Sequence, residues 1–454
     1  MEFTTTQRGA SQLLYEGHRY QINRKGKEGR IFWRCHNRDC PGRLSTQGET
    51  VQSSKPHNHP EDRADVAVQK VKSQLRQDAQ EKTQPIPTLF NDALAQLALQ
   101  EEAPELAATM PTFPSYKSSL YRSRRKVHPP LPVGRADVTL EGKWTETLDG
   151  QRFLLRSDGE EDKILIFVTD RMLDRLATST TLYMDGTFAV CPRIFYQLFS
   201  INIIIDHQQF PAVYALLPNK SRATYNRFFT LLKEELQNLG ITLRPTSVLV
   251  DFEMALLQAV QLHFPDTDVK GCYFHFSQCL WRWVQNNGHV VLYREDEEFR
   301  TFVKNAAALA FLPPQTARLA WSTIKLNQSD SAPAEAFSQY FSSTWMKDFP
   351  VRMWNHFEAC EDRTNNRLEG WHNRLNRLAG RDHPNLYQLI TLLQKEDSVS
   401  EFKILQLQSG GLPITKRNKW QRQDKRIKRL QEKFVAGKLS IADFMDSACH
   451  LSGL

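Results

Sequence analysis

The sequence predicts an α+β or α/β fold, in which a mixed β-sheet covered by helices follows a small β-sheet domain. Three observations lead to this fold class. Strand-like apolar runs alternate with helical patterns over residues 133–275, residues 276–395 are almost wholly helical, and residues 1–62 combine short strand-like runs with a close group of Cys and His. Strands that come first and then alternate with helices are typical of a mixed sheet with a helical cover.

The composition indicates a globular chain with a polyanionic partner. At 454 residues it is long enough for two or three domains. The net charge of +8 and the pI of about 9.0 favour nucleic acid as that partner. No apolar run is long enough to cross a bilayer, so no membrane partner is expected. We also expect the start of the chain not to be a signal peptide. The seven scattered cysteines argue against a secreted disulfide framework and indicate a reducing compartment.

Residues 1–62 are predicted to form a metal-stapled β-sheet. Its strand-like runs are Arg19–Asn23 and Arg30–Cys35. Two thiols and two imidazoles within 25 residues suit tetrahedral zinc, and the alternative is two free thiols beside a histidine-bearing loop. The fragment around Trp33 is too small to bury a core without such a staple. The candidate zinc ligands are Cys35, Cys40, His57 and His59.

Residues 63–132 are predicted to be a helical linker with a basic end. Apolar residues recur at helical spacing, and several prolines divide the stretch into short helices. The basic run Tyr121–Lys126 closes it, and Pro129 and Pro130 mark a domain boundary. We expect Arg124 and Arg125 to contact nucleic acid.

Over residues 133–275, apolar runs predict the strands of the mixed sheet. The helix Tyr225–Leu239 repeats apolar residues at helical spacing, and Gly240 is its predicted end cap. A second helix is expected to run through Leu262. The predicted strands are Lys163–Thr169, Thr181–Val190, Tyr196–Ile205, Phe210–Leu217 and Ser247–Val250.

Three acids on separate elements point to metal chemistry. Asp185 lies within an apolar strand, where a carboxylate costs free energy unless it is paired or binds a cation. Asp251 directly follows a strand, where α/β active sites gather, although such an Asp is often only a helix cap. Glu369 lies on a predicted helix and shares a face with His372, three residues later. Hard Mg²⁺ prefers oxygen ligands, and two such ions about 3.5–4 Å apart promote phosphodiester cleavage.

A short segment near the end accounts for most of the excess positive charge. Residues 416–433 hold nine Lys or Arg against Asp424 and Glu432. Contact of Lys425 and Arg426 with DNA is one interpretation, and a solvated helix or a nuclear-import signal is the other. The aromatic helix with Trp281 and Trp283 is expected to pack internally rather than to stack on bases.

The amino-terminal segment resembles a FLYWCH-type zinc finger. The resemblance rests on Phe3, Leu14, Tyr15, Gly17, Tyr20, Trp33-Arg34-Cys35, Cys40 and His57-Asn58-His59. It implies a small zinc-stapled sheet in which a strand meets the DNA major groove. Phosphate or guanine contacts would then come from Arg24, Lys25, Arg30 and Arg34. A finger that binds protein instead remains an alternative.

Residues from about 163 to 280 resemble the transposase domain of Mutator-like elements. The resemblance rests on Met184-Asp185-Gly186-Thr187-Phe188, on Asp251 with Glu253 and Ala255, and on Gly271-Cys272-Tyr273-Phe274-His275. The segment around Asn366, Glu369 and His372 is similar to the part of the family that carries the third acid, although Glu358, Glu361 and Asp362 lie nearby. Cys272 and His275 are interpreted as structural or as supporting the acids, with half of a zinc site as the alternative.

This resemblance implies an RNase H-like fold whose core, residues 133–275 and 361–395, is interrupted by a helical insertion at 276–360. A basic helical tail occupies 396–454. The implied function is a DNA transposase in which Asp185, Asp251 and Glu369 hold Mg²⁺ or Mn²⁺ for strand cleavage and transfer, with His372 beside them. The implied location is the nucleus, and a homo-oligomer is expected by family likeness. The alternative is a domesticated, non-catalytic DNA-binding regulatory protein.

Overall fold

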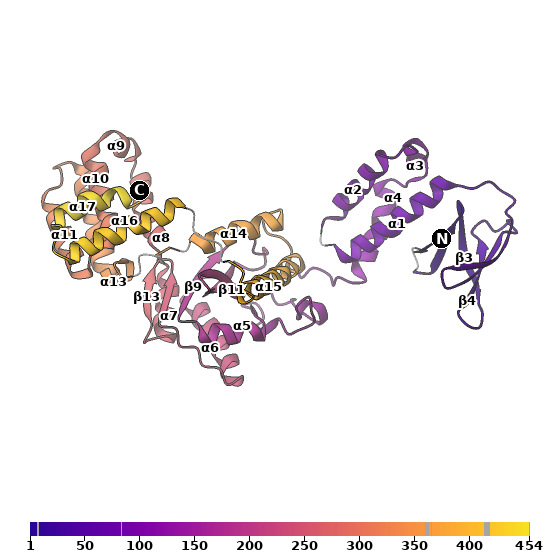
Figure 1. The fold of residues 1–454 in the computed structure, drawn as a ribbon, viewed down its shortest axis with the longest axis horizontal. Coiled ribbons are helices and arrows are strands. Elements are labelled where there is room, and N and C mark those ends of the chain that lie inside the picture. Colours follow the sequence, from indigo (N-terminus) through magenta and orange to yellow (C-terminus); the bar gives the residue numbers. More distant parts are fainter. Residues whose placement is uncertain (7–8, 83, 359–362, 365, 413–417, 454) are drawn as a thin grey trace. The chain divides into compact units, whose positions relative to one another are not determined.

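The structure, a computed structural model, describes residues 1–454 except 7–8, 83, 359–362, 365, 413–417 and 454 (Figure 1). The chain divides into two compact units, Met1–Leu131 and Pro132–Leu454. The division falls directly after Pro129 and Pro130, where the sequence predicts a domain boundary.

The first unit begins with a six-stranded antiparallel sheet in which each strand pairs with the next one along the chain. Because side chains alternate along a strand, Ile31 and Trp33 face the small core while Phe32 and Arg34 face outward. Trp33 Nε1 donates a hydrogen bond to Thr46 Oγ1 at 2.9 Å. The strands are β1 (Glu2–Thr5), β2 (Ser11–Tyr15), β3 (His18–Lys25), β4 (Arg30–Cys35), β5 (Arg43–Gln47) and β6 (Thr50–Lys55).

The stretch expected to be a helical linker forms a packed helical cluster of its own. Leu75, Phe90 and Leu120 belong to its buried core. The cluster is tied to the sheet by Arg76, which donates to the Tyr116 hydroxyl at 2.7 Å and to the carbonyl of Thr5. The zinc-finger region and these helices therefore fold as one unit. The helices are α1 (Arg63–Glu81), α2 (Ile86–Ala98), α3 (Ala103–Thr109) and α4 (Phe113–Arg125).

The second unit is built around a seven-stranded mixed sheet in the order β13-β12-β9-β10-β11-β8-β7. Strand β12 pairs in parallel with both β9 and β13, and the other pairs are antiparallel. Every run that the sequence predicts as a strand overlaps one, β11 begins two residues before its predicted run, and Ser247–Val250 has the predicted bounds. The strands are β7 (Leu154–Asp158), β8 (Ile164–Phe167), β9 (Thr181–Thr187), β10 (Gln197–Ile205), β11 (Gln208–Leu217), β12 (Ser247–Val250) and β13 (Asp268–Gly271).

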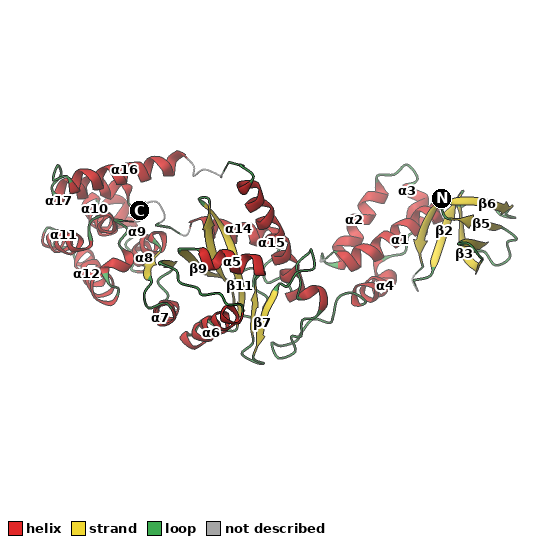
Figure 2. Cartoon of the chain, turned by 60° about the horizontal axis from the view of Figure 1, so that its bottom comes forward, coloured by secondary structure: helices red, strands yellow, loops and turns green. Residues whose placement is uncertain are grey.

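Helices cover both faces of this sheet (Figure 2). Leu182 and Met184 of β9 face α5, α6 and α7, whereas Tyr183 between them faces α14 and α15. Helix α6 starts earlier than predicted because the side chain of Ser221 accepts a hydrogen bond from Thr224 N. Gly240, with φ of +71°, ends it as expected. The helices are α5 (Asp170–Thr178), α6 (Arg222–Asn238), α7 (Met254–His263), α14 (Asn366–Ala379) and α15 (Leu386–Gln408), and a 3₁₀ turn, η1, covers Gly142–Trp144.

The remaining helices enclose a separate aromatic-rich core. Trp345 and Trp354 are buried in it, and Trp281 and Trp283 pack at its border, which agrees with the expected packing role. Its elements are α8 (Tyr273–Asn286), α9 (Val290–Glu295), α10 (Glu297–Ala308), η2 (Leu309–Phe311), α11 (Pro314–Leu326), α12 (Ala332–Phe341), the π-helix η3 (Ser342–Asp348), α13 (Val351–Trp354), α16 (Asn418–Val435), α17 (Ile441–Ala448) and η4 (Cys449–Leu451).

The expected tail at 396–454 is not one separate element. A capping box at Asn385 and Gln388 starts α15. The helix continues past residue 395, because its buried apolar residues extend as far as Ile404. Further on, α16 and α17 lie beside α10 (Figure 1), and Ile427 of α16 and Phe444 of α17 are buried in the aromatic-rich core. Among the described residues, no helix combines the length and hydrophobicity that a membrane crossing requires.

His356 makes the stability of this second unit sensitive to acid. Its Nε2 donates to the Gly271 carbonyl at 2.9 Å, while its buried Nδ1 has no hydrogen-bond partner within the protein. Burial lowers the pKa of His356 to about 3. In the unfolded chain this pKa is about 6.5, so the unfolded state takes up a proton first as the pH falls.

We therefore expect the free energy of unfolding to drop by about 2 kcal/mol between pH 7 and pH 5 because of this one group. Urea titrations of the wild type and of His356→Gln at both pH values measure the effect. The variant, less stable at pH 7, should lose correspondingly less on acidification. An equal loss in both proteins would show that His356 is not the titrating group.

Candidate functional site

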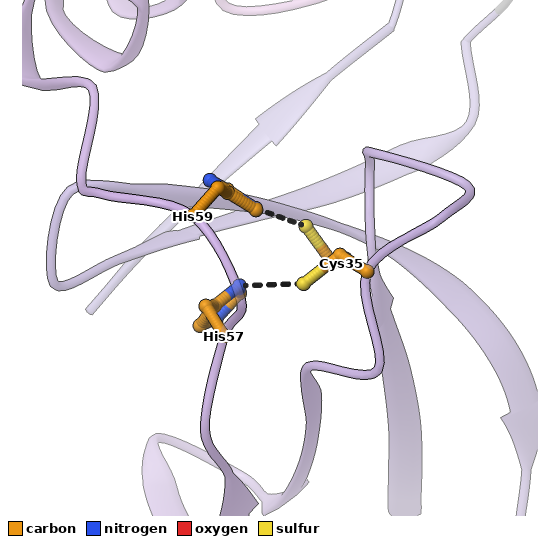
Figure 3. Close-up of side chains that lie close together, drawn as sticks. Cys35, His57 and His59 are labelled. Atoms are coloured by element: carbon orange, nitrogen blue, oxygen red, sulfur yellow. Dashed lines mark hydrogen bonds between the residues drawn. The ribbon is translucent and has the colours of Figure 1, made fainter.

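The four predicted zinc ligands converge in the first unit. Their ligand atoms all lie within 4.8 Å of one another. Cys35 lies at the end of β4, and the two histidines lie in the loop between β6 and α1. Cys35 Sγ is 3.4 Å from His59 Nε2 (Figure 3). Cys40 Sγ is 3.3 Å from His57 Nδ1. Two thiolates and two imidazoles at this spacing form the donor set of a structural zinc site.

Neighbouring groups hold the ligands in place. His57 Nε2 contacts the Tyr20 hydroxyl at 2.7 Å, and His59 Nδ1 contacts the Pro60 carbonyl at 2.9 Å. The ring nitrogen of each histidine that does not face a thiol is therefore engaged, which fixes the ring orientation. A Cβ at Gly42 would overlap the His57 ring, so only glycine fits there. The sequence did not single out Tyr20 or Gly42 for these roles.

The outward face of the finger sheet is basic. Register pairs Arg34 with Arg43 and Arg43 with Lys55. Arg24 and Arg30 approach the Phe32 ring, with guanidinium carbons 4.3 and 5.2 Å from its centroid. Of the residues predicted to contact nucleic acid, Arg24, Lys25 and Arg34 are exposed and Arg30 is half-buried. The face thus offers several cations to a polyanion.

The other residues predicted to contact nucleic acid differ in how far their side chains are exposed. Lys425 and Arg426 are exposed on α16, and Arg125 is exposed at the end of α4. Arg124 instead turns inward and donates to the carbonyls of Ala79, Lys82 and Gln84. It covers the carboxyl end of α1, where the last carbonyls have no helical partner. The guanidinium of Arg124 is therefore committed within the protein.

Strand register in the second unit brings the first two acids together. In the parallel pair β12–β9, Leu249 aligns with Tyr183, and both face α14 and α15. Continuing this register by two residues places Asp251 beside Asp185 on the same face. The carboxylate of Asp185 accepts from Gly186 N at 2.8 Å, and that of Asp251 accepts from Glu253 N at 3.2 Å.

Helix α14 places Glu369 and His372 on this side of the sheet. His372 Nδ1 is 3.8 Å from Asp185 Oδ2. His275, in the first turn of α8, lies with Nε2 3.3 Å from Glu369 Oε1. The structure therefore groups the three predicted acids with both predicted histidines. Cys272, which precedes α8, is fully buried and offers no exposed thiol.

The acids repel one another in a desolvated setting. Burial, with the neighbouring Asp251, raises the pKa of Asp185 to about 8. Burial also raises the pKa of Asp251, with His275 opposing the shift, and it raises the pKa of Glu369. Desolvated carboxylates this close together favour a bound cation, because its charge would offset their mutual repulsion.

Burial lowers the pKa of both histidines, and the lowered value of His372 makes that side chain neutral at physiological pH. Burial lowers the pKa of His372 to about 4, with His275 adding to the shift, and burial also lowers the pKa of His275. The contact of His372 with Asp185 is therefore not an ion pair. Neutral imidazoles at these positions can accept or donate a single hydrogen bond and thereby orient a carboxylate.

Glu253 is a fourth acid that was not predicted as a site residue. Its pKa is raised by burial and by Asp251, and a hydrogen bond with Tyr225 opposes the shift. Its Oε1 is a buried atom. Lys220 Nζ lies 3.9 Å from its other oxygen. In the sequence, the signal for a site role of Glu253 was its position two residues after Asp251. A further, partly buried acid beside Asp251 and Asp185 adds oxygen ligands of the kind that a hard cation prefers.

The acids are less tightly gathered than the finger ligands. Within the part of the chain that the structure describes, the Cys35, Cys40, His57 and His59 group is the one set of such residues close enough to share a single ion as it stands. Of the alternative third acids, Glu358 is exposed. Glu361 and Asp362 lie outside the described residues.

Comparison with protein families assigns both regions. Residues 181–279 match the MULE transposase domain. The matched segment contains Asp185, Asp251, Cys272 and His275, whereas Glu369 lies beyond it. Residues 3–59 match the FLYWCH zinc finger domain and include all four ligands of the Cys and His cluster. Among curated proteins, no match to the chain is found.

The two matches support a transposase-derived protein that binds DNA. The FLYWCH match and the cluster together indicate zinc as the metal of the first unit. Zinc bound there would cross-link the loops of a small sheet whose buried hydrophobic cluster consists of Leu13, Tyr20, Trp33 and Leu44.

Proposed function

We propose that the protein is a MULE-type DNA transposase that cleaves and joins DNA strands with the help of Mg²⁺ or Mn²⁺. The observation that carries the proposal is the grouping of Asp185, Asp251 and Glu369 on one side of the sheet, within contact of His372 and His275. In this proposal the sheet is RNase H-like, with the first acid in a central strand and the second at the end of the adjacent parallel strand.

The residues have separate tasks in this proposal. Asp185, Asp251 and Glu369 hold the cations, and His275 fixes the orientation of the Glu369 carboxylate. Bound Mg²⁺ supplies charge stabilisation and a more acidic water for hydrolysis of a phosphodiester. The basic sheet face of the finger and the exposed Lys425 and Arg426 hold the DNA backbone. Nuclear location and assembly into a homo-oligomer accompany this function in the proposal.

A second candidate is a domesticated regulatory protein that binds DNA without cleaving it. The wider spacing of the acids, compared with the finger ligands, favours this candidate. A finger and a basic helix suffice for DNA binding, so DNA binding does not depend on the acids. DNA binding alone therefore does not separate the two functions.

Cleavage of DNA that carries the terminal repeats flanking the coding region tests the proposal. We expect Mg²⁺-dependent nicking by the wild type and its loss in Asp251→Asn, because the amide cannot replace a charged metal ligand. Binding of the same DNA should be unchanged. Equal cleavage by both proteins would remove Asp251 from this role. A wild type that binds the repeats without cleaving them would establish the regulatory alternative.

A further inference from the structure

A cleft of about 640 Å³ lies in the second unit on the side of α14 away from the acids. Arg367, Gly370 and Trp371 line it, at a spacing of three and four residues that defines one face of a helix. Glu369 and His372 point from the opposite face toward His275 and Asp185. One helix therefore carries part of the proposed metal site on one side and a wall of the cleft on the other.

Helix α8 also connects the proposed metal site with the cleft. Phe274 lines the cleft, and its ring meets the ring of His275 edge-on, with centroids 5.7 Å apart. The cleft thus begins beside the residue that contacts Glu369. Across α14, the cleft and the acids are about one helix diameter, or roughly 10 Å, apart. At the stacked rise of about 3.4 Å per nucleotide, a DNA strand covers this distance in about three steps.

The charges of the cleft favour an anion. Its two acids are already engaged, Asp424 with Arg363 and Glu396 with Arg374. Two further cations, Arg367 and Lys403, also line it. Neither of them forms an ion pair with any carboxylate in the described ranges, although Arg367 donates to the carbonyl of His207. The lining therefore has a surplus of positive charge.

Unsatisfied donors in the wall favour a ligand rich in acceptors. Gln209 Nε2, Ser277 Oγ and Trp371 Nε1 are buried atoms with no hydrogen-bond partner in the protein. All three residues line the cleft. Because a buried donor without a partner costs free energy, an acceptor-bearing ligand would recover it. The edges of nucleobases and the oxygens of phosphate provide such acceptors.

Aromatic side chains complete the lining. Trp420 of α16 is 42% exposed, and Phe274 is half-buried. Exposed aromatic rings beside cations are the usual components of a surface that binds single-stranded nucleic acid, because every base has a face that stacks. A volume of this size accommodates a nucleotide, since ligand sites commonly span about 300–1,000 Å³.

We propose that this cleft binds one unpaired nucleotide of the DNA strand, a few steps from the phosphodiester at the acids. Arg367 and Lys403 bind its phosphate, and its base lies among Trp420, Phe274 and the unsatisfied donors. The inference rests on the proposed DNA-directed function of the acidic site. A free nucleotide has the same chemistry, and the experiment below separates the two sources.

The test uses the full-length protein without Mg²⁺, so that binding is measured apart from cleavage. A duplex with a single-stranded extension carries 2-aminopurine at one position at a time. We expect strong quenching at one extension position in the wild type, caused by stacking in the cleft. Trp420→Ala should abolish that quenching, whereas Trp420→Phe should retain it.

Lys403→Gln tests the phosphate contact, and Lys395→Gln is its matched control, an exposed lysine on the same helix that does not line the cleft. We expect Lys403→Gln to reduce the salt dependence of binding to the extension by about 0.7 in logarithmic slope, the value for one phosphate of a single strand. The control should keep the wild-type slope. Equal behaviour of Lys403→Gln and Lys395→Gln, or quenching that survives in Trp420→Ala, would overturn the proposal.

A separate experiment with deoxyadenosine monophosphate alone tests whether the cleft binds a free nucleotide. We expect millimolar concentrations of it to leave the quenching at the extension unchanged. Saturable binding of the free nucleotide, lost in Trp420→Ala and displacing the extension, would assign the cleft to a free ligand instead. Failure of Asp251→Asn to affect cleavage would leave the quenching result intact, so the two proposals fail separately.

Discussion

Removal of zinc is expected to unfold residues 3–59 while residues 132–454 stay folded. Metal binding contributes about 10–16 kcal/mol in small zinc domains, which equals or exceeds the whole stability of many domains. Among the described residues of the sheet, the buried hydrophobic cluster consists of four side chains, Leu13, Tyr20, Trp33 and Leu44. Hydrogen exchange of the full-length protein, before and after chelation, should show amide protection lost in residues 3–59 and retained in residues 132–454.

Substitution of one ligand should reproduce the effect of the chelator. We expect Cys40→Ser to lower the zinc content toward zero and to abolish protection in residues 3–59, because the weakened site no longer holds the sheet together. Cys279→Ser is the matched control, since Cys279 is a half-buried thiol of α8 remote in sequence from the cluster. Persistent protection in zinc-free protein would mean that the sheet is stable without its staple.

The second large effect concerns the identity of the third acid. Glu369→Gln is expected to slow Mg²⁺-dependent DNA cleavage by on the order of 10³. A catalytic metal contributes several kcal/mol, and each 1.36 kcal/mol changes the rate tenfold. The amide keeps the size of the side chain and its reach toward His275, so folding should be retained, which thermal unfolding would verify.

Glu358→Gln provides the comparison, because Glu358 lies nearby in sequence, is exposed, and carries the same functional group. We expect it to cleave at close to the wild-type rate. If Glu358→Gln is inactive and Glu369→Gln is active, the third acid has been assigned to the wrong residue. The measurement is the initial rate of strand nicking at saturating Mg²⁺ for the three proteins side by side.

Local features of the fold were predictable from the sequence. Runs such as Ser247–Val250 identified strands, and Gly240 identified the end of α6, because both depend on a few adjacent residues. The metal cluster was predictable for the same reason, since its ligands lie within a short segment and their chemistry is specific.

Features that depend on distant pairing were not predictable by the same means. The parallel register of β12 with β9, which sets Asp251 beside Asp185, leaves no periodic signal in the sequence. The role of Glu253 depends on that register too. Arg124 was expected to bind DNA because it lies in a basic run, but whether a cation faces water or a helix end depends on tertiary packing.

The position of α16 and α17 has a consequence for biosynthesis. Residues from both helices complete the apolar interior formed by α8 to α13, although more than sixty residues separate α13 from α16 in the chain. On the ribosome, the middle of the protein therefore emerges with one side uncovered and must wait for the carboxyl-terminal segment. Until α16 and α17 have been synthesised, it would depend on chaperones to avoid aggregation.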